Sequence, residues 1–263
     1  MDYSGWARSG RDGRVHPVTL GVDPAGLGSA DWDACWQGGL PAVPTGGCVY
    51  GVALNHVDEL AALGAALGEP PYKAPPKAPI LYVKPSNTWS GPFADIVVPD
   101  GIDTVEVGAS VALVFGRDTT RVRACSAWQH VEGLTLVADL SVPSPSFYRP
   151  PVRFKCLDGF CPIGPWVVQP HAALQSGSVT LEVRVDGSLL QSVSLHALVR
   201  DAAKLIEDIS AFMTFRAGDV LMLGSGPGRP MVRPGQRVSV SCAGLGRLEN
   251  RLIRVDASGS PAP

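Results

Sequence analysis

A long apolar run predicts a strand that is buried on both faces of a sheet. Residues 104–116 read TVEVGASVALVFG and become almost continuously apolar toward their end. A strand with one face in solvent would alternate apolar and polar residues, so this run indicates a central strand. A second such segment, LTLVADLSV, covers residues 134–142. Shorter strands are predicted over residues 15–22, 48–54, 80–86 and 94–99.

The last third of the chain predicts a hairpin followed by a helix and more strands. VTLEVRVDGSLLQSVSL, residues 179–195, alternates cleanly on either side of Asp186-Gly187, which favours a type I′ turn. Residues 197–212 predict an amphipathic helix, and the sequence after it predicts three short strands joined by Gly/Pro turns. One stripe of that helix is apolar and contains Leu198, Ala202, Leu205, Ile206 and Ile209.

The remaining segments divide the chain into a main domain and its appendages. An Ala/Leu-rich helix is predicted over 57–68, with Gly68 as its C-cap. The proline-rich residues 69–79 predict an extended loop, and residues 144–168 predict a long loop-rich segment. We therefore predict an α+β domain that is mostly β. The expected boundaries are an N-terminal appendage over 1–46, the domain over 47–256 and a disordered tail over 257–263.

Composition excludes several classes of protein. The chain has 263 residues, a formal net charge of −2 and no basic stripe, so we expect no nucleic-acid partner. It has no apolar run of the ~18 residues that cross a bilayer, so we expect no membrane partner. Its first residues lack an apolar segment typical of a signal peptide, and its six cysteines fit no zinc spacing. We therefore expect buried free thiols and a cytoplasmic location.

Several motifs, in the same order along the chain, carry a resemblance to a known family. FKCLDGFCPIGPWVV (154–168) fits the pattern K-x-x-D-x-F-x-P-[IL]-G-P, and YVKPSNTWSG (82–91) fits an early lysine strand. The closing segments AGDVLMLGSG, RPGQRVSV and GLGRLENRL follow the hairpin and helix. From about residue 48 to 255, the chain resembles the fumarylacetoacetate hydrolase family. The resemblance implies a twisted β-roll with short peripheral helices, of the C-terminal-domain type of that family.

Within the family, four segments resemble one group of enzymes more closely. YKAPPKAP, KPSNT, SFYRPPV and KCLDGFCPIG look like the N-terminal half of the bifunctional decarboxylase/isomerases of homoprotocatechuate (4-hydroxyphenylacetate) breakdown. We expect a free-standing N-terminal half. The resemblance implies action on 5-oxopent-3-ene-1,2,5-tricarboxylate, on 2-hydroxyhepta-2,4-diene-1,7-dioate, or on both.

The resemblance implies a divalent metal ion, but this sequence retains only some of the residues that bind the ion in the family. Family members bind Mg²⁺, Mn²⁺ or Ca²⁺ through carboxylates, as hard cations prefer. The Glu-x-Glu pair of the family aligns with Gly108 and Ser110, whereas its third ligand, an Asp, is retained as Asp139. We therefore expect a degenerate metal site, and it stays open whether this chain binds any metal.

The other site residues also follow from the resemblance. The general-base His of catalytic members aligns with Glu59, so that residue is a candidate catalytic group. His56, three residues before it, is a capping or packing candidate. The remaining candidates match the polar cluster of the family, as catalytic Lys84 and Lys155 and as substrate-binding Tyr148, Arg149, Asp158 and Ser225.

Reasoning from the residues themselves leaves the local arrangement open. Glu106 shares a strand face with Gly108, but it lies about 7 Å along the strand and would need a bulge to replace the lost ligand. Asp139, in an apolar strand, requires a partner such as Lys84 or Lys155, because an unpaired buried carboxylate is costly. Lys155 could instead pair with Asp158.

Three hypotheses about function remain at this point. The chain is an enzyme subunit, a non-catalytic partner of a metal-bearing sister chain, or a metal-free protein that binds di- or tricarboxylates. The last is suggested by the cations Lys84, Arg149 and Lys155, which could bind an anion without a metal. We expect a homodimer, or a heterodimer with the sister family subunit, and a small di- or tricarboxylate ligand.

Overall fold

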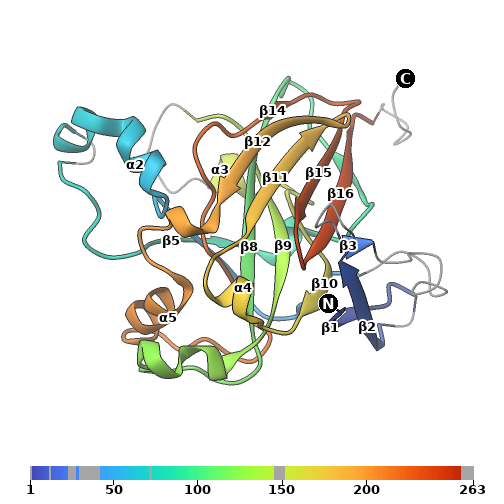
Figure 1. Ribbon diagram of the computed structural model, residues 1–263. Helices are drawn as coiled ribbons and strands as arrows, with labels where there is room; N and C mark the ends of the chain where they lie inside the picture. Colours follow the sequence, from blue (N-terminus) through green and yellow to red (C-terminus); the bar gives the residue numbers. More distant parts are fainter. Residues whose placement is uncertain are drawn as a thin grey trace.

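The computed structural model describes residues 2–11, 13–22, 28–29, 42–70, 73–144 and 152–255. Within these ranges the protein consists of two β-sheets, with short helices around their edges (Figure 1). The prediction of a mostly β, α+β domain is confirmed.

The larger sheet contains eleven of the described strands. Nine follow the order β3-β2-β1-β10-β9-β8-β13-β4-β5, while β14 pairs with β8 and β6 pairs with β10. Their bounds are β1 Asp2–Arg8, β2 Val15–Val22, β3 Gly28–Ser29, β4 Val49–Ala53, β5 Ile80–Lys84, β6 Trp89–Ser90, β8 Val105–Phe115, β9 Val131–Ser141, β10 Cys161–Val168, β13 Val220–Met222 and β14 Met231–Val232. The strands predicted over 15–22, 48–54, 80–86, 104–116 and 134–142 are all present.

The smaller sheet covers one face of the larger one. Its five strands follow the order β12-β11-β15-β16-β7, and β11, β15 and β16 pack against β8 and β9. Their bounds are β7 Asp95–Val97, β11 Thr180–Val185, β12 Ser188–Ser194, β15 Arg237–Cys242 and β16 Gly246–Ile253. Asp186 and Gly187 both have positive φ, of 48° and 84°, as the predicted type I′ hairpin turn requires. Between α5 (Ala202–Ser210) and residue 255, four strands are present and not the predicted three.

Strand β8 is buried on both faces, as its sequence predicts. Val107 and Leu113 belong to the main core between the two sheets. Ala112 and Val114 point to the other face and join a second apolar cluster with Val137. Glu106, Gly108 and Ser110 share this second face, because side chains alternate along a strand. That face is therefore apolar at one end and polar at the other.

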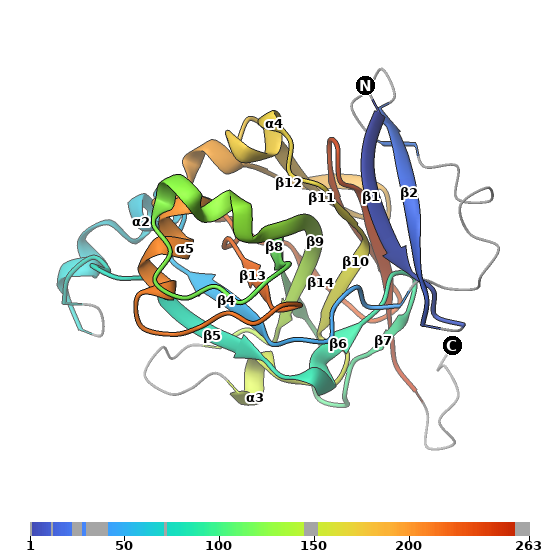
Figure 2. The same cartoon turned by 90° about the horizontal axis from the view of Figure 1, so that it is seen from below.

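The large sheet curls so that its edge strand β5 faces β9. After β5 the chain passes through β6, which pairs with β10 on the far side of β9 (Figure 2). The side chain of Lys84, at the end of β5, reaches the backbone carbonyl of Leu140 in β9. The curl thus gathers β5, β8 and β9 around the polar end of the second face.

The helices are shorter than predicted. Those in the described ranges are α2 Val57–Leu63, α3 Val152–Lys155, α4 Ala172–Gln175 and α5 Ala202–Ser210, with 3₁₀ helices at Gly64–Gly68, Ser86–Thr88, Ala124–His130 and Leu195–Ala197. Helix α2 ends at Gly64, with φ 48°, and not at Gly68, so the predicted C-cap is wrong. Helix α5 begins after Asp201, whose side chain accepts a hydrogen bond from the Lys204 amide. Leu198 therefore lies outside the helix.

The segment predicted to be loop-rich contains a fully buried strand. In β10 every residue from Cys161 to Val168 is buried, although the strand includes Pro162 and Pro165. Proline lacks an amide donor and argues against a central strand. Here the register with β9 shifts between Gly164 and Val168, and this irregularity accommodates the missing donor at Pro165.

The N-terminal strands extend the large sheet. β1 pairs with β10 and β2 pairs with β1, so these residues continue the sheet beyond β10. The predicted tail lies outside the described residues. The described cysteines are free, but only Cys161 and Cys242 are buried, so the expectation of buried thiols holds in part. Among the described helices, none is long and apolar enough to cross a membrane.

Candidate functional site

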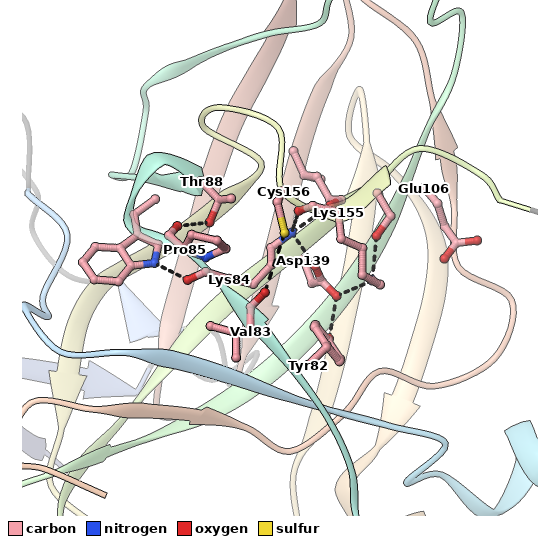
Figure 3. A network of polar contacts seen from close by, with 12 residues as sticks. Tyr82, Val83, Lys84, Pro85, Thr88, Glu106, Asp139, Lys155 and Cys156 are labelled. Atoms are coloured by element: carbon pink, nitrogen blue, oxygen red, sulfur yellow. Dashed lines mark hydrogen bonds and ion pairs between the residues drawn. The ribbon is translucent and has the colours of Figure 1, made fainter. Parts of the chain in front are cut away.

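Asp139 lies at the centre of a buried network of charges (Figure 3). Its side chain is 4% exposed, and both oxygens contact cations. Lys84 Nζ lies 2.7 Å from Oδ1, and Lys155 Nζ lies 2.8 Å from Oδ2. The prediction that Asp139 pairs with Lys84 or Lys155 is confirmed, because it pairs with both.

Lys84 is enclosed by the protein and out of reach of a ligand. Its side chain is 0% exposed. Besides the ion pair, Nζ donates to the carbonyl oxygens of Leu140, at 3.0 Å, and of Lys155, at 2.6 Å. An ammonium has three donors, and two of them bond these carbonyl oxygens, while Asp139 Oδ1 is a close ion-pair partner without a hydrogen bond. Lys84 therefore serves as a fixed internal counterion.

Lys155 and Tyr82 complete the shell around the carboxylate. Lys155 Nζ also donates to Ser141 Oγ at 2.7 Å and lies 4.8 Å from the centre of the Tyr82 ring. The Tyr82 hydroxyl donates to Asp139 Oδ2 at 2.6 Å. Burial raises the pKa of Tyr82 well above its usual value, and the Asp139 charge raises it further, so the phenol stays protonated and remains a donor.

The two lysines determine the ionisation of Asp139. Burial alone would raise the pKa of its carboxyl group, but the ammonium groups of Lys155 and Lys84 outweigh burial and hold that pKa well below its usual range. Asp139 is therefore a carboxylate at neutral pH, and its charge is already balanced by the protein.

The positions of the missing family ligands are filled by close packing. Gly108 lies directly opposite Asp139 in the β8–β9 ladder. A Cβ at position 108 would lie 3.1 Å from the Asp139 carbonyl oxygen and 3.3 Å from Ser225 Oγ, so neighbouring atoms would have to move slightly. Ser110 is buried, and its hydroxyl donates to the Val111 carbonyl at 2.8 Å.

Glu106 and Glu59 belong to a second network. Arg229 Nη1 donates to Glu106 Oε1 at 3.0 Å, and Arg229 Nη2 donates to Glu59 Oε1. Glu106 stands apart from the contacts around Asp139 (Figure 3). The register of β8 with β9 is regular from Glu106 to Val114, so no bulge brings Glu106 toward the lost ligand positions.

The residues around Asp139 do not fit a divalent metal ion. A hard cation needs several oxygen ligands, and its affinity rises with their negative charge. Asp139 is the only carboxylate in its network of ion pairs, and two ammonium groups occupy its oxygens. Within the described ranges, no group of three or more His, Cys, Asp or Glu side chains could hold a metal.

The other predicted site residues are only partly brought together. Ser225 lies beside Gly108, with its Oγ 3.3 Å from where a Cβ at that position would be; its substrate-binding role stays a prediction. Asp158 accepts a hydrogen bond from Asn87 Nδ2 at 2.7 Å instead of pairing with Lys155. His56 is the N-cap of α2, and its Nδ1 accepts from the Asp58 amide at 3.3 Å, so the capping interpretation is confirmed. Tyr148 and Arg149 lie outside the described residues.

Sequence reasoning missed three side chains of these networks. Tyr82 and Ser141 lie two residues from Lys84 and Asp139 along their strands, and this same-face spacing could have identified them. Arg229 lies in SGPGRP, a segment without periodicity between β13 and β14. Nothing in that turn sequence indicates that its arginine reaches two glutamates.

Comparison with known proteins identifies the family. The profile described as "Fumarylacetoacetate (FAA) hydrolase C-terminal" matches residues 48–253. The chain therefore belongs to the fumarylacetoacetate hydrolase family, as its motifs predict. The crystal structure of 5-carboxymethyl-2-hydroxymuconate delta-isomerase from Mycobacterium smegmatis superposes with a TM-score of 0.71 and 27% identity, covering 97% of this chain and 99% of that one.

Curated relatives include enzymes of aromatic breakdown. The chain is 39% identical over 207 residues to the 4-hydroxyphenylacetate degradation bifunctional isomerase/decarboxylase of Escherichia coli, a match covering 79% of this chain and 47% of that relative. The chain thus spans about half the length of the curated relatives that it matches first. Fumarylpyruvate hydrolase from Pseudomonas aeruginosa, solved with Mn²⁺ and pyruvate, shares the fold at 22% identity and a TM-score of 0.66, covering 82% of this chain and 91% of that one.

Proposed function

We propose that the chain is a subunit of a decarboxylase/isomerase of 4-hydroxyphenylacetate catabolism and carries no working metal centre of its own. Its substrates would be 5-oxopent-3-ene-1,2,5-tricarboxylate, 2-hydroxyhepta-2,4-diene-1,7-dioate, or both, processed at the metal site of a sister chain. The observation that carries this proposal is the state of Asp139. Its carboxylate is held by Lys84, Lys155 and Tyr82, while Gly108 and Ser110 provide no acid.

The pairing with a sister chain is supported by the lengths of the relatives. The Escherichia coli enzyme aligns over 47% of its length, so it contains roughly one further segment of this size. A sister chain with glutamates at the positions of Gly108 and Ser110 would supply the carboxylates that this chain lacks. The fold retained here would then contribute to assembly.

The geometry disfavours the hypothesis of a metal-free anion pocket. Such a pocket needs cations with free donors. Lys84 is fully buried against Asp139 and two carbonyl oxygens, and the Arg229 guanidinium lies between two glutamates. Arg149, the third cation of this hypothesis, lies outside the described residues. Lys155 retains one donor but already contacts Asp139 and Ser141. The cations of these networks are therefore committed to internal acids and carbonyl groups.

The proposal is tested by measuring CO₂ release from the tricarboxylate and isomerisation of the heptadienedioate with Mg²⁺. The chain is assayed alone and after mixing with a sister chain of the family that retains both glutamates. We expect no turnover by this chain alone and a stable complex by size-exclusion chromatography. Turnover by this chain alone, lost when Asp139 is changed to Asn, would overturn the proposal.

A second variant separates catalysis from folding. Glu59→Gln removes the candidate base of this chain without altering the Asp139 network. If Glu59 acted as the general acid or base, its loss would lower kcat by about 10²–10⁴-fold. We expect the mixture to keep its kcat, whereas changing either metal-binding glutamate of the sister chain should abolish turnover.

A further inference from the structure

Arg229 connects three elements that are distant in the sequence. It lies between β13 and β14, and its guanidinium contacts Glu59 of α2 and Glu106 of β8. The pairing of β14 with β8 fixes its place, because Met231 lies directly opposite Glu106 and Arg229 precedes Met231 by two residues. The arginine is therefore held beside the polar end of β8 by the sheet itself.

Helix α2 depends on few contacts with the rest of the protein. None of its residues is buried, and it projects from one side of the molecule (Figure 1). Its first residues are fixed by the His56 cap and by Asn55, whose side chain bonds the backbone of Arg200 and Leu223. Beyond that anchor, Glu59 forms an ion pair with Arg229. Among the described residues, this is the ion pair that joins α2 to the rest of the protein.

The two glutamates require a cation between them. Burial raises the pKa of Glu59, while the Arg229 charge opposes this shift. Two carboxylates that converge on one point repel each other unless a positive charge lies between them. Arginine is suited to this role, since its guanidinium stays charged and binds two acceptors in a fixed geometry.

The charges of the two networks balance each other when they are counted together. The Asp139 network has one carboxylate and two ammonium groups, whereas the Arg229 network has two carboxylates and one guanidinium. Together, three acids face three cations. Taken together, the two networks carry no excess negative charge to attract a divalent ion.

We propose that Arg229 is a resident cation that bridges α2 and β8 by pairing with Glu59 and Glu106 at once. This inference shares one assumption with the proposed function, namely that the chain binds no metal ion of its own. Removing the arginine should release α2 and leave Glu59 and Glu106 as a weak two-carboxylate site for Mn²⁺ or Ca²⁺. The metal would then restore the bridge.

The test compares Arg229→Ala with two control variants. Arg233→Ala removes a nearby exposed arginine, and the double variant Arg229→Ala/Glu59→Gln removes one of the released acids. Hydrogen exchange of the α2 amides is measured with and without Mn²⁺, and Mn²⁺ binding is followed by electron paramagnetic resonance. Circular dichroism confirms that each variant is folded.

We expect faster exchange across α2 in Arg229→Ala by about tenfold or more, which corresponds to losing a bridge of roughly 1.4 kcal/mol. Mn²⁺ at a few millimolar should slow exchange again in this variant but not in the double variant, since extracellular-type Ca²⁺ sites bind at ~10⁻⁴–10⁻³ M. The unmodified chain and Arg233→Ala should show neither effect.

Two results would overturn the inference. One is unchanged α2 exchange in Arg229→Ala, and the other is Mn²⁺ binding by the unmodified chain as strong as by the variant. These outcomes are separate from the proposed function, because they are measured on this chain alone and without substrate. Turnover by this chain alone would reject the proposed function and leave the α2 measurement as it stands.

Discussion

The Asp139 and Arg229 networks are built from the same kinds of groups but differ in burial. Lys84 and Asp139 are 0% and 4% exposed, whereas Arg229 and Glu106 are 25% and 30% exposed. A buried ion pair costs desolvation, and losing one partner leaves an uncompensated charge. A partly exposed pair loses little, because water replaces the partner. The first network therefore fixes the core, while the second holds a peripheral helix.

The two networks also differ in how they change acid ionisation. At Asp139, burial raises the pKa but two lysines outweigh it, so the pKa is lowered. At Glu59, burial raises the pKa and the single arginine does not outweigh it, so the pKa stays raised. The balance between burial and the neighbouring charges decides the direction of each pKa shift. Neither arrangement presents the free carboxylates that a divalent metal requires.

The largest expected effect comes from Lys84→Met, which removes a fully buried counterion. Breaking a buried ion pair typically costs 3–5 kcal/mol, and we expect about 3 kcal/mol because Lys155 still contacts Asp139. Urea denaturation followed by circular dichroism measures the change. Lys77→Met, at an exposed lysine, is the matched control and should change stability little. An equally small loss in Lys84→Met would contradict the burial argument.

Tyr82→Phe should have a smaller but clear effect. It removes only the hydroxyl that donates to the buried carboxylate of Asp139. Hydrogen bonds to charged groups contribute about 1.5–3 kcal/mol, so we expect the free energy of unfolding to fall by about 2 kcal/mol. Thermal and urea denaturation should agree. No loss of stability would mean that the two lysines alone satisfy Asp139.

Glu106→Gln tests the Arg229 network, which is the more exposed of the two. The carboxylate is partly exposed and shares Arg229 with Glu59, so its neutralisation should cost about 0.2–1 kcal/mol, as is usual for exposed ion pairs. The measurement is again urea denaturation. A loss as large as that of Lys84→Met would show that the two networks are energetically equivalent and would remove the distinction drawn here.

The smallest effect concerns pH, and its sign differs between the two acids. A free Asp has a pKa of about 3.9 and Asp139 titrates lower when folded, so its stabilising contribution is present above about pH 4 and is lost as the pH falls through the folded value. Glu59 has a raised pKa, so its ionised form disfavours folding, and this cost disappears as the pH falls.

This difference in sign is measured by comparing the unmodified chain with Glu59→Gln in urea from pH 7 to pH 4. We expect the stability difference to move in favour of the unmodified chain as the pH falls, since protonation relieves the cost at Glu59. A difference that stays constant over this range would show that the Glu59 pKa is not raised.

Much of the fold can be predicted from local sequence patterns. Where the prediction differs from the structure, particular residues explain the difference. Central strands β8 and β9 were predicted because their apolar runs reflect burial on both faces. The hairpin was predicted because Asp186-Gly187 specifies its turn. Strand β10 was missed because two prolines argue against pairing, whereas the register shift that accommodates one of them depends on β9. The early end of α2 follows from Gly64, and the late start of α5 follows from its N-cap Asp201.

The candidate site could be predicted only where chemistry is local. A carboxylate in an apolar strand must be paired, and the sequence offers Lys84 and Lys155 as the partners of Asp139. The role of Arg229 could not be found in this way. Its contacts with Glu59 and Glu106 span 170 and 123 residues, and they depend on β14 aligning with β8.

Anomalous scattering from a crystal soaked in Mn²⁺ tests the central claim most directly. The claim is that protein cations already balance the acids of this site. It predicts no Mn²⁺ peak among Lys84, Asp139, Lys155 and Ser225, with both lysines still in contact with the carboxylate. A Mn²⁺ peak on Asp139, with Lys84 or Lys155 displaced, would contradict this claim. It would show that this chain binds a metal ion as the metal-dependent members of its family do.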